Sequence, residues 1–313
     1  MAALGVILIP AMIEREKFSD PFAHGVVAAA SSIAVIIPPS ISFVIYASLT
    51  GVSVGDIFVA GILPGVIMGV AMIIVVQIYA HKHHLKPAHP WKGWREVWRT
   101  FKSAFWGLLM PVIILGGIYG GVFSATEAAA VAAVYGLFVG TVIYKKLKWK
   151  DIVELLYDTA KSTGGLMLII GGATIFSYAC TRYGISTSVQ ALLENCGKGG
   201  FLVIINIVLL IAGCFMDANS NMYIFVPIMY PVAREFGIDP IQFGMICTVN
   251  LAIGQFTPPV GTNLFVASSL RIPGHRVGVE DVAKACLPMI AAAVLVLLLV
   301  TYVPQVTTCL IGG

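Results

Sequence analysis

Two proline pairs interrupt long uncharged segments of the sequence, and polar side chains gather beside both. The pairs are Pro38-Pro39 and Pro258-Pro259. A proline lacks an N–H donor and clashes with the preceding helical turn, so a pair stops a helix and leaves main-chain carbonyls without helical partners. Carbonyls, hydroxyls and amides are neutral hard oxygens, which suit a small hard cation such as Na⁺. The polar side chains near the pairs are Ser31, Ser32, Ser40, Ser42, Asn250, Thr257, Thr262 and Asn263.

The helix that resumes after each proline pair offers a second kind of binding group. Its first N–H groups have no partner within the helix and carry partial positive charge, so they favour an anion such as a carboxylate. The two interruptions together therefore predict a place where Na⁺ and an organic acid bind. The alternative is a pair of proline kinks that pack against neighbouring helices, and the alignment of the two pairs favours the functional break.

The proline pairs belong to an internal repeat. Residues 37–48 align with residues 257–268 at an offset of 220, with the double proline and a terminal Ala-Ser in common. Each match is weak alone, but their order along the chain is typical of a duplicated unit. The upstream matches, at an offset of 219, are Asp20-Pro21 with Asp239-Pro240 and Gly25 with Gly244.

Two acidic residues stand beside or within long uncharged segments. Asp217 follows an uncharged run and shares a hairpin tip with Asn219. An acid inside a membrane is a functional candidate, but Asp217 could equally cap a helix at the tip, and both interpretations stay open. Glu127 lies three residues after Ser124, which is the spacing of a capping box, so there we favour the structural role.

The elements that must position these residues are membrane helices. The chain is 58% hydrophobic and 11% charged, whereas a soluble domain carries about 25% charge. Its uncharged runs predict roughly eight passes or half-passes through a bilayer, hence an all-α polytopic membrane protein. A net charge of +4 gives no indication of nucleic-acid binding. No enzyme motif occurs, the six cysteines form no close pair, and no metal other than sodium is expected.

The distribution of basic residues predicts the topology. Residues 81–102 and 145–161 hold 11 of the 19 basic residues, and such loops stay in the cytoplasm. By parity, the first broken segment, 22–50, runs outward and the second, 240–270, runs inward. Inverted repeats with interrupted helices are typical of secondary transporters. Aromatic residues at helical spacing in 91–105, interleaved with basic ones, predict a separate helix in the cytoplasmic interface.

The predicted spans and the repeat divide the chain into five parts. Two of these parts, the transport parts, hold the two copies of the repeat. Several spans precede copy two in the sequence, and copy one lacks them, so we expect roughly 115 further residues before Met1. The parts are 1–56 (the remainder of the first hairpin and its broken helix), 57–103 (a scaffold span and the interfacial arm helix), 104–162 (scaffold helices and a second arm), 163–284 (the second-repeat helix, hairpin and broken helix) and 285–313 (the final membrane helix).

The sequence resembles the large membrane subunit of tripartite ATP-independent periplasmic (TRAP) transporters over essentially its whole length. The most specific of the stretches that carry the resemblance is 250–268, NLAIGQFTPPVGTNLFVAS. The other stretches are Ala2–Gly5 with Ile9-Pro10, 28–41 (which ends in IIPPSI), 60–65 (AGILPG), 126–129 (TEAA) and 215–217 (FMD).

The resemblance implies an inverted-repeat elevator with re-entrant hairpins, in the inner membrane of a bacterium and driven by Na⁺ as coupling ion, with no other cofactor. It implies three partners: a small four-helix membrane subunit, a periplasmic solute-binding protein and an organic acid such as a dicarboxylate. The alternatives are a stand-alone sodium/dicarboxylate symporter and an inactive fragment. The expected sodium-binding residues are Ile37, Pro38, Ser40, Asp217, Asn219, Thr257, Pro258, Gly261 and Thr262, and the expected substrate-binding residues are Ser42, Asn250 and Asn263.

Overall fold

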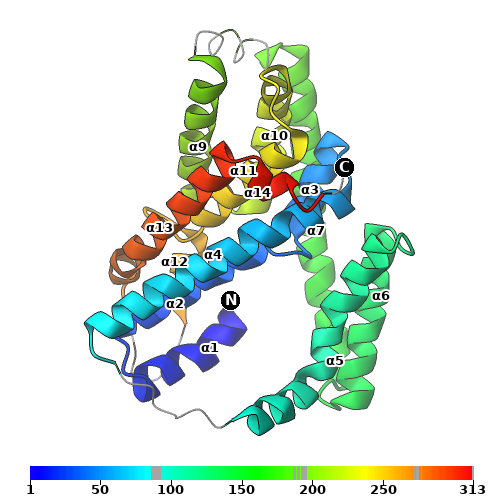
Figure 1. The fold of residues 1–313 in the computed structure, drawn as a ribbon. Coiled ribbons are helices and arrows are strands. Elements are labelled where there is room, and N and C mark those ends of the chain that lie inside the picture. The colour runs from blue at the N-terminus through cyan, green and yellow to red at the C-terminus, as the bar shows by residue number, and fades with distance from the viewer. Residues whose placement is uncertain are drawn as a thin grey trace. The chain divides into compact units, whose positions relative to one another are not determined.

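The computed structural model describes residues 1–85, 93–185, 188, 191, 196–270, 272, 275 and 277–311. Trp91, which the sequence assigns to the interfacial helix, lies outside the described residues. The regular secondary structure of the described part is helical, apart from one isolated bridge between Ile272 and His275 (Figure 1). Its elements are α1 (Ala2–Pro10), η1 (Ala11–Arg15), α2 (Asp20–Ser32), η2 (Ile33–Val35), α3 (Ile41–Thr50), α4 (Val54–Lys82), α5 (Trp94–Tyr119), α6 (Ala125–Phe138), η3 (Val139–Ile143), α7 (Trp149–Arg182), α9 (Gly197–Phe215), α10 (Ala218–Glu235), α11 (Pro240–Gly254), α12 (Thr262–Ser269), α13 (Val279–Tyr302) and α14 (Gln305–Thr308).

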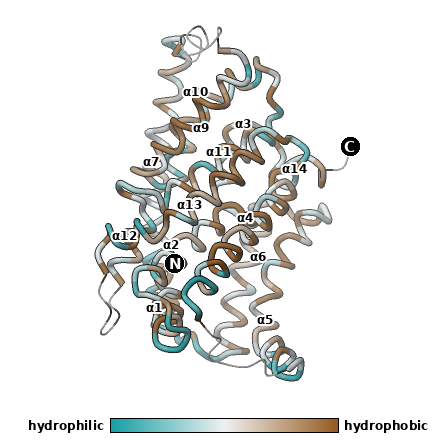
Figure 2. The backbone as a smooth tube through the Cα atoms, turned by 60° about the vertical axis from the view of Figure 1, so that its left-hand side comes forward, coloured by the Kyte–Doolittle hydropathy of each residue, from teal (hydrophilic) through white to brown (hydrophobic). Residues whose placement is uncertain are grey.

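The expected all-α polytopic membrane fold is confirmed. Six helices among the described residues are long and apolar enough to cross a bilayer, and α3 and α11 are shorter apolar helices. Figure 2 shows α4 as hydrophobic along its middle. With 29 residues α4 is longer than the roughly 20 that a span requires, so its polar last turns extend beyond the apolar core.

The chain forms two compact units. The first holds residues 1–88 and 176–313, and the second holds 89–175. At the core of the first unit lies α11, in which every residue from Gln242 to Gly254 is buried. Asp239 accepts bonds from the first N–H groups of α11, and Pro240 begins the helix without needing a partner for its nitrogen. The helices α3, α4, α9, α10 and α13 pack against α11.

The packing within the first unit follows the predicted repeat. In the alignment α2 corresponds to α11, and α3 corresponds to α12. The helices that follow the two copies exchange contacts, since α13 packs on α2 while α4 packs on α11. Likewise α10 packs on α3 and α1 packs on α12. Such reciprocal pairing is what a two-fold relation between the copies produces.

Two aligned glycines make this exchange possible. A Cβ on Gly25 of α2 would lie 3.2 Å from the Sγ of Cys286 in α13. A Cβ on Gly244 of α11 would lie 2.8 Å from the side chain of Ile57 in α4. Each glycine therefore lets its helix approach the helix that follows the other copy.

The ends of the two broken segments also meet. The Nδ1 of His275, which follows α12, lies 2.8 Å from the Oδ2 of Asp20 at the start of α2. The start of the first broken segment and the end of the second therefore lie on the same side of a bilayer, as opposite chain directions require.

The second unit contains the hairpin of α5 and α6. The capping box predicted at its turn is confirmed, because Ser124 accepts from the N–H of Glu127 and Glu127 accepts from the N–H of Ser124. The separate interfacial helix is not found in the described residues. Instead α5 runs unbroken from Trp94 to Tyr119, because no proline or glycine separates the aromatic stretch from the span before Gly107.

Candidate functional site

The first proline pair breaks the helix as the sequence predicts. The first helix of the segment ends at Ser32, η2 follows, and α3 begins only at Ile41. Ser40 is buried and its hydroxyl donates to the carbonyl of Val35 at 2.6 Å, which satisfies one carbonyl of the break. Pro38 is also buried, whereas Ile37 is 42% exposed.

Two glycines of α4 accommodate the first break. A Cβ on Gly61 would lie 2.8 Å from the carbonyl oxygen of Ile36, and a Cβ on Gly65 would lie 2.5 Å from the side chain of Ile37. One side of the irregular backbone is thus covered by α4, and such cover is the condition for breaking a helix within a membrane.

The second proline pair breaks the other copy in the same way. Here α11 ends at Gly254 and α12 begins at Thr262. Gly261 has a φ of 56°, and a Cβ there would lie 2.9 Å from the carbonyl of Thr257, so the tight loop requires glycine. The N–H of Gly261 donates to the carbonyl of Cys214 at 2.8 Å, which fastens this break to the end of α9.

The tip between α9 and α10 holds the acidic candidate. Asp217 caps α10, because its Oδ2 accepts from the N–H of Ser220 at 3.0 Å and its Oδ1 accepts from the Ser220 hydroxyl at 2.6 Å. The capping interpretation is therefore confirmed. The carboxylate is also exposed, so a cap and an ion ligand are compatible roles, and the second stays a prediction.

The buried side chain of Asn221 bonds to several main-chain carbonyls of the same tip. Its Nδ2 donates to the carbonyls of Ala212, Met216 and Asp217 at 3.2–3.3 Å. These carbonyls would repel an amide oxygen, so the orientation of the amide is fixed. The Oδ1 of Asn221 is fully buried and has no hydrogen-bond partner in the described part of the chain.

Side-chain bonds bring the breaks and the tip into one body. The Ser42 hydroxyl, on α3, donates to the Oδ1 of Asn219 at 2.9 Å. Asn263, on α12, donates through Nδ2 to the carbonyl of Ala28 at 3.2 Å and to the Oε1 of Gln255 at 3.3 Å. The tip is thus joined to the first copy at α3, and the second break is joined to the first copy at α2.

Asn250 lies apart from the break surfaces. It is fully buried, and its Nδ2 donates to the Oδ1 of Asn206 at 2.7 Å and to the carbonyl of Ile246 at 2.8 Å. Asn206 in turn donates to the hydroxyl of Thr301 at 3.1 Å. The structure therefore places Asn250 in a buried polar network between α9, α11 and α13. Its role as a substrate ligand stays a prediction.

Several of these residues are not among those predicted from the sequence. They include Asn206, Thr301 and Gln255, although an amide such as Asn206 within an uncharged run is a signal that could have found it. Gly61 and Gly65 were predicted only as part of the stretch 60–65 that carries the family resemblance. Their contact with the first break is a tertiary relation that the sequence does not encode locally.

The groups at the breaks and the tip fit Na⁺. They are main-chain carbonyls, hydroxyls, amide oxygens and one exposed carboxylate, which are the ligands of a hard cation. The buried, unpaired Oδ1 of Asn221 is an acceptor that a cation or a water would satisfy. Among the described residues there is no group of three or more His, Cys, Asp or Glu side chains that could hold a metal ion.

Comparison with known proteins gives a consistent result. The family model described as "Tripartite ATP-independent periplasmic transporter, DctM component" matches residues 1–306. Proteins named C4-dicarboxylate TRAP transporter large permease protein DctM are similar, with 42% identity in Pseudomonas aeruginosa and 40% in Vibrio cholerae. In both cases the alignment covers 99% of this chain and 72% of the relative. The isethionate TRAP transporter permease protein DctMQ of Oleidesulfovibrio alaskensis is 39% identical over 98% of this chain and 48% of its own length.

Proposed function

Because the chain belongs to the DctM family of TRAP transporter large permease subunits, we propose that it is the permease of a sodium-coupled system that takes up organic acids. It is a multi-pass protein of the bacterial inner membrane and a transport subunit rather than an enzyme. The observation that carries the proposal is the joining of two helix breaks and a hairpin tip in one body through Ser42–Asn219, Gly261–Cys214 and Asn263–Ala28.

The proposed substrate is a small organic anion, with C4-dicarboxylates first. Two of the relatives above are named for C4-dicarboxylates and a third for isethionate, a small sulfonate. These compounds share a compact negative group with several acceptor oxygens. The N-terminal turns of α3 and α12 begin at the two breaks and would favour such a group. We assign substrate contact to Ser42 and Asn263, which stand in these turns.

The proposed coupling ion is Na⁺, held by the breaks and the tip. Around the first break the groups would come from Ile37, Pro38 and Ser40, and around the second from Thr257, Pro258, Gly261 and Thr262. Asp217 and Asn219 would contribute from the tip. Na⁺ would neutralise carbonyl and carboxylate charge beside the bound anion, so that ion and substrate bind favourably together.

The proposed mechanism is an elevator in which one body carries the site across the membrane. We infer that α4 and α13 move with the broken helices, because α4 packs on α11 and α13 packs on both α2 and α11. This differs from the five-part division above, which placed residues 57–82 with the scaffold. The proposed scaffold comprises α5, α6 and the first part of α7.

The proposed partners are a small four-helix membrane subunit and a periplasmic solute-binding protein. TRAP systems consist of several components, and the large permease would receive its substrate from the binding protein. Uptake that proceeds without any binding protein would instead favour a stand-alone symporter.

The test is uptake of radiolabelled succinate by proteoliposomes that contain the complete complex. We expect uptake to require a Na⁺ gradient and to stop when choline replaces Na⁺. Asn263→Ala removes the bonds to Ala28 and Gln255, so the Na⁺ concentration for half-maximal uptake should rise several-fold. Ser269→Ala, also on α12, removes a bond to the carbonyl of Val266 in the same helix, and uptake should stay unchanged. Full uptake without Na⁺ would refute the proposal.

A further inference from the structure

One end of the α5–α6 hairpin brings together two segments that are distant in the sequence. The Tyr144 hydroxyl, after η3, donates to the carbonyl of Ser103 in α5 at 2.8 Å. One helical turn further along α5, the Tyr135 hydroxyl donates to the carbonyl of Trp106 at 2.8 Å. The segment 144–150 therefore begins beside the first turns of α5.

The first turns of α5 expose a row of aromatic rings. Trp98 stacks on Phe101 with ring centroids 5.6 Å apart, and Phe101 meets Phe105 edge-on at 6.0 Å. Phe105 contacts Trp106 at 5.5 Å. All four rings are at least 40% exposed. Exposed Trp side chains of this kind are enriched at the level of the lipid headgroups.

Helix lengths place the first two of these rings, Trp98 and Phe101, near the membrane surface. With 26 residues, α5 is about 39 Å long, which exceeds the roughly 30 Å of the hydrocarbon core. The excess corresponds to about six residues, and the polar ones are all in its first turns. The span Ala125–Ile143 has 19 residues and is about 28 Å long, so it ends close to the same boundary. The chain after Ile143 thus emerges beside the polar start of α5.

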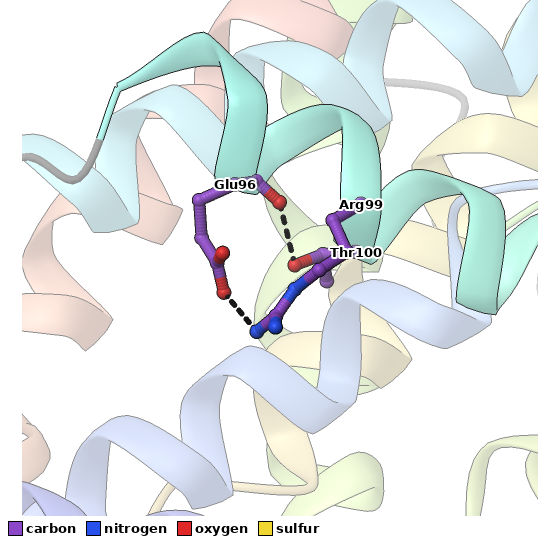
Figure 3. Close-up of polar contacts among 3 residues, drawn as sticks. All are labelled: Glu96, Arg99 and Thr100. Atoms are coloured by element: carbon purple, nitrogen blue, oxygen red, sulfur yellow. Dashed lines mark hydrogen bonds and ion pairs between the residues drawn. The ribbon is translucent and has the colours of Figure 1, made fainter.

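Basic residues predominate at this boundary. Of the two acids among residues 94–103 and 144–151, Glu96 is bound to Arg99 at 2.6 Å (Figure 3), and the Oδ2 of Asp151 accepts from the N–H of Lys148 at 2.8 Å. The Nζ of Lys102 lies 6.0 Å from the centre of the Trp98 ring. The basic residues of the two segments are Arg95, Arg99, Lys102, Lys145, Lys146, Lys148 and Lys150, all exposed.

The turn after η3 fixes the backbone of two lysines. The N–H groups of Lys146 and Leu147 both donate to the carbonyl of Gly140, at 2.9 and 3.1 Å, and Lys145 has a φ of 52°. With the Tyr144–Ser103 bond, this closed turn holds the main chain of Lys145 and Lys146 near α5. Because the backbone is already ordered, only the lysine side chains lose freedom when they bind an anion.

We propose that the basic–aromatic surface, formed by Arg99, Lys102, Lys145 and Lys146 with the rings of Trp98 and Phe101, binds the phosphate headgroup of an anionic phospholipid. The clustered cations match the phosphate, and the exposed rings match the interface in which that phosphate lies. A soluble acidic partner would match the charges but would leave the rings without an apolar environment. A zwitterionic lipid would match the rings but would leave the excess positive charge uncompensated.

The tryptophans provide a direct measurement. All five tryptophans of the chain lie between Trp91 and Trp149, so its tryptophan fluorescence, excited selectively, reports on this part of the protein alone. The full chain is placed in nanodiscs of phosphatidylcholine with a fixed minor fraction of dibrominated phosphatidylglycerol or of dibrominated phosphatidylcholine. We expect the brominated anionic lipid to quench the fluorescence roughly two-fold more strongly, because it is enriched at the surface, and we expect added salt to reduce the difference.

Amino-acid variants distinguish lipid binding at this surface from a general effect of the protein's positive charge. The double substitution Lys145→Gln/Lys146→Gln should abolish the excess quenching, while Lys145→Arg/Lys146→Arg should retain it. Lys284→Gln is the control, since Lys284 is exposed in α13 of the other unit and pairs with Glu280; it should leave the excess unchanged. Equal quenching by the two brominated lipids, or excess quenching that persists in the double glutamine variant, would overturn the proposal.

Discussion

At the scale of single residues, Asp217 shows how one side chain serves two candidate roles. The sequence left open whether it caps a helix or binds an ion. The bonds from the N–H and hydroxyl of Ser220 establish the cap. They do not use the full capacity of a carboxylate, which has about four acceptor positions. A substitution that keeps the cap and removes the charge can therefore separate the two roles.

Asp217→Asn is that substitution, because asparagine caps helices about as well as aspartate. We expect the variant to unfold at nearly the wild-type temperature in KCl. In NaCl the wild-type protein should gain stability, by up to about 2.7 kcal/mol when Na⁺ is at 100 times its dissociation constant. The variant should gain clearly less, as measured by thermal unfolding at matched ionic strength. If both proteins respond equally to Na⁺, Asp217 is a cap and nothing more.

At the scale of elements, the proline pairs made the breaks predictable, whereas the contacts between helices were not. A double proline blocks helix formation locally, so the ends of α2 and α11 could be placed from the sequence. Asn206, Asn250 and Thr301 come from three helices and meet only after folding. The unbroken α5 was also missed, since aromatic spacing predicts an interfacial face but does not show where a helix ends.

The network between α9, α11 and α13 gives an element-scale prediction. Thr301→Val keeps the shape of the side chain but removes the acceptor of the Asn206 amide, while Thr301→Ser keeps the hydroxyl. We expect the valine variant to lose about 1 kcal/mol of unfolding free energy, because a buried donor is left unpaired. The serine variant should lose less. Thermal unfolding in detergent measures both, and the reverse order of stability would count against a stabilising network.

At the scale of the whole molecule, α4 and α13 belong to the same compact unit as the broken helices. Gly25 and Gly244 let α13 and α4 approach α2 and α11 closely. The sequence-based division placed α4 with the scaffold, because a long apolar span has the same composition wherever it packs. Whether α4 moves with the broken helices stays a prediction.

A cross-link can test this grouping. In Gly25→Cys the new side chain would lie beside Cys286, because a Cβ at position 25 is 3.2 Å from the Cys286 Sγ. Oxidation should then join α2 to α13. If both helices belong to the moving body, uptake by the oxidised complex should stay near that of the same variant after reduction. Loss of uptake that a reducing agent restores would place α13 with the stationary part, and Gly25→Ala controls for the added bulk.

The buried polar network also gives the two repeat copies different side chains at corresponding positions. Where copy two has Asn250, the first copy has Ala30 and Ser31, and the Ser31 hydroxyl donates to Ala28 of its own helix. If the chain works by the proposed elevator mechanism, with halves that exchange roles between two extreme positions, matching interiors would leave those positions equal in energy. The buried amide of Asn250, which Ala30 and Ser31 do not match, removes that equality. We therefore expect the empty protein to rest preferentially on one side of the membrane even without an ion gradient.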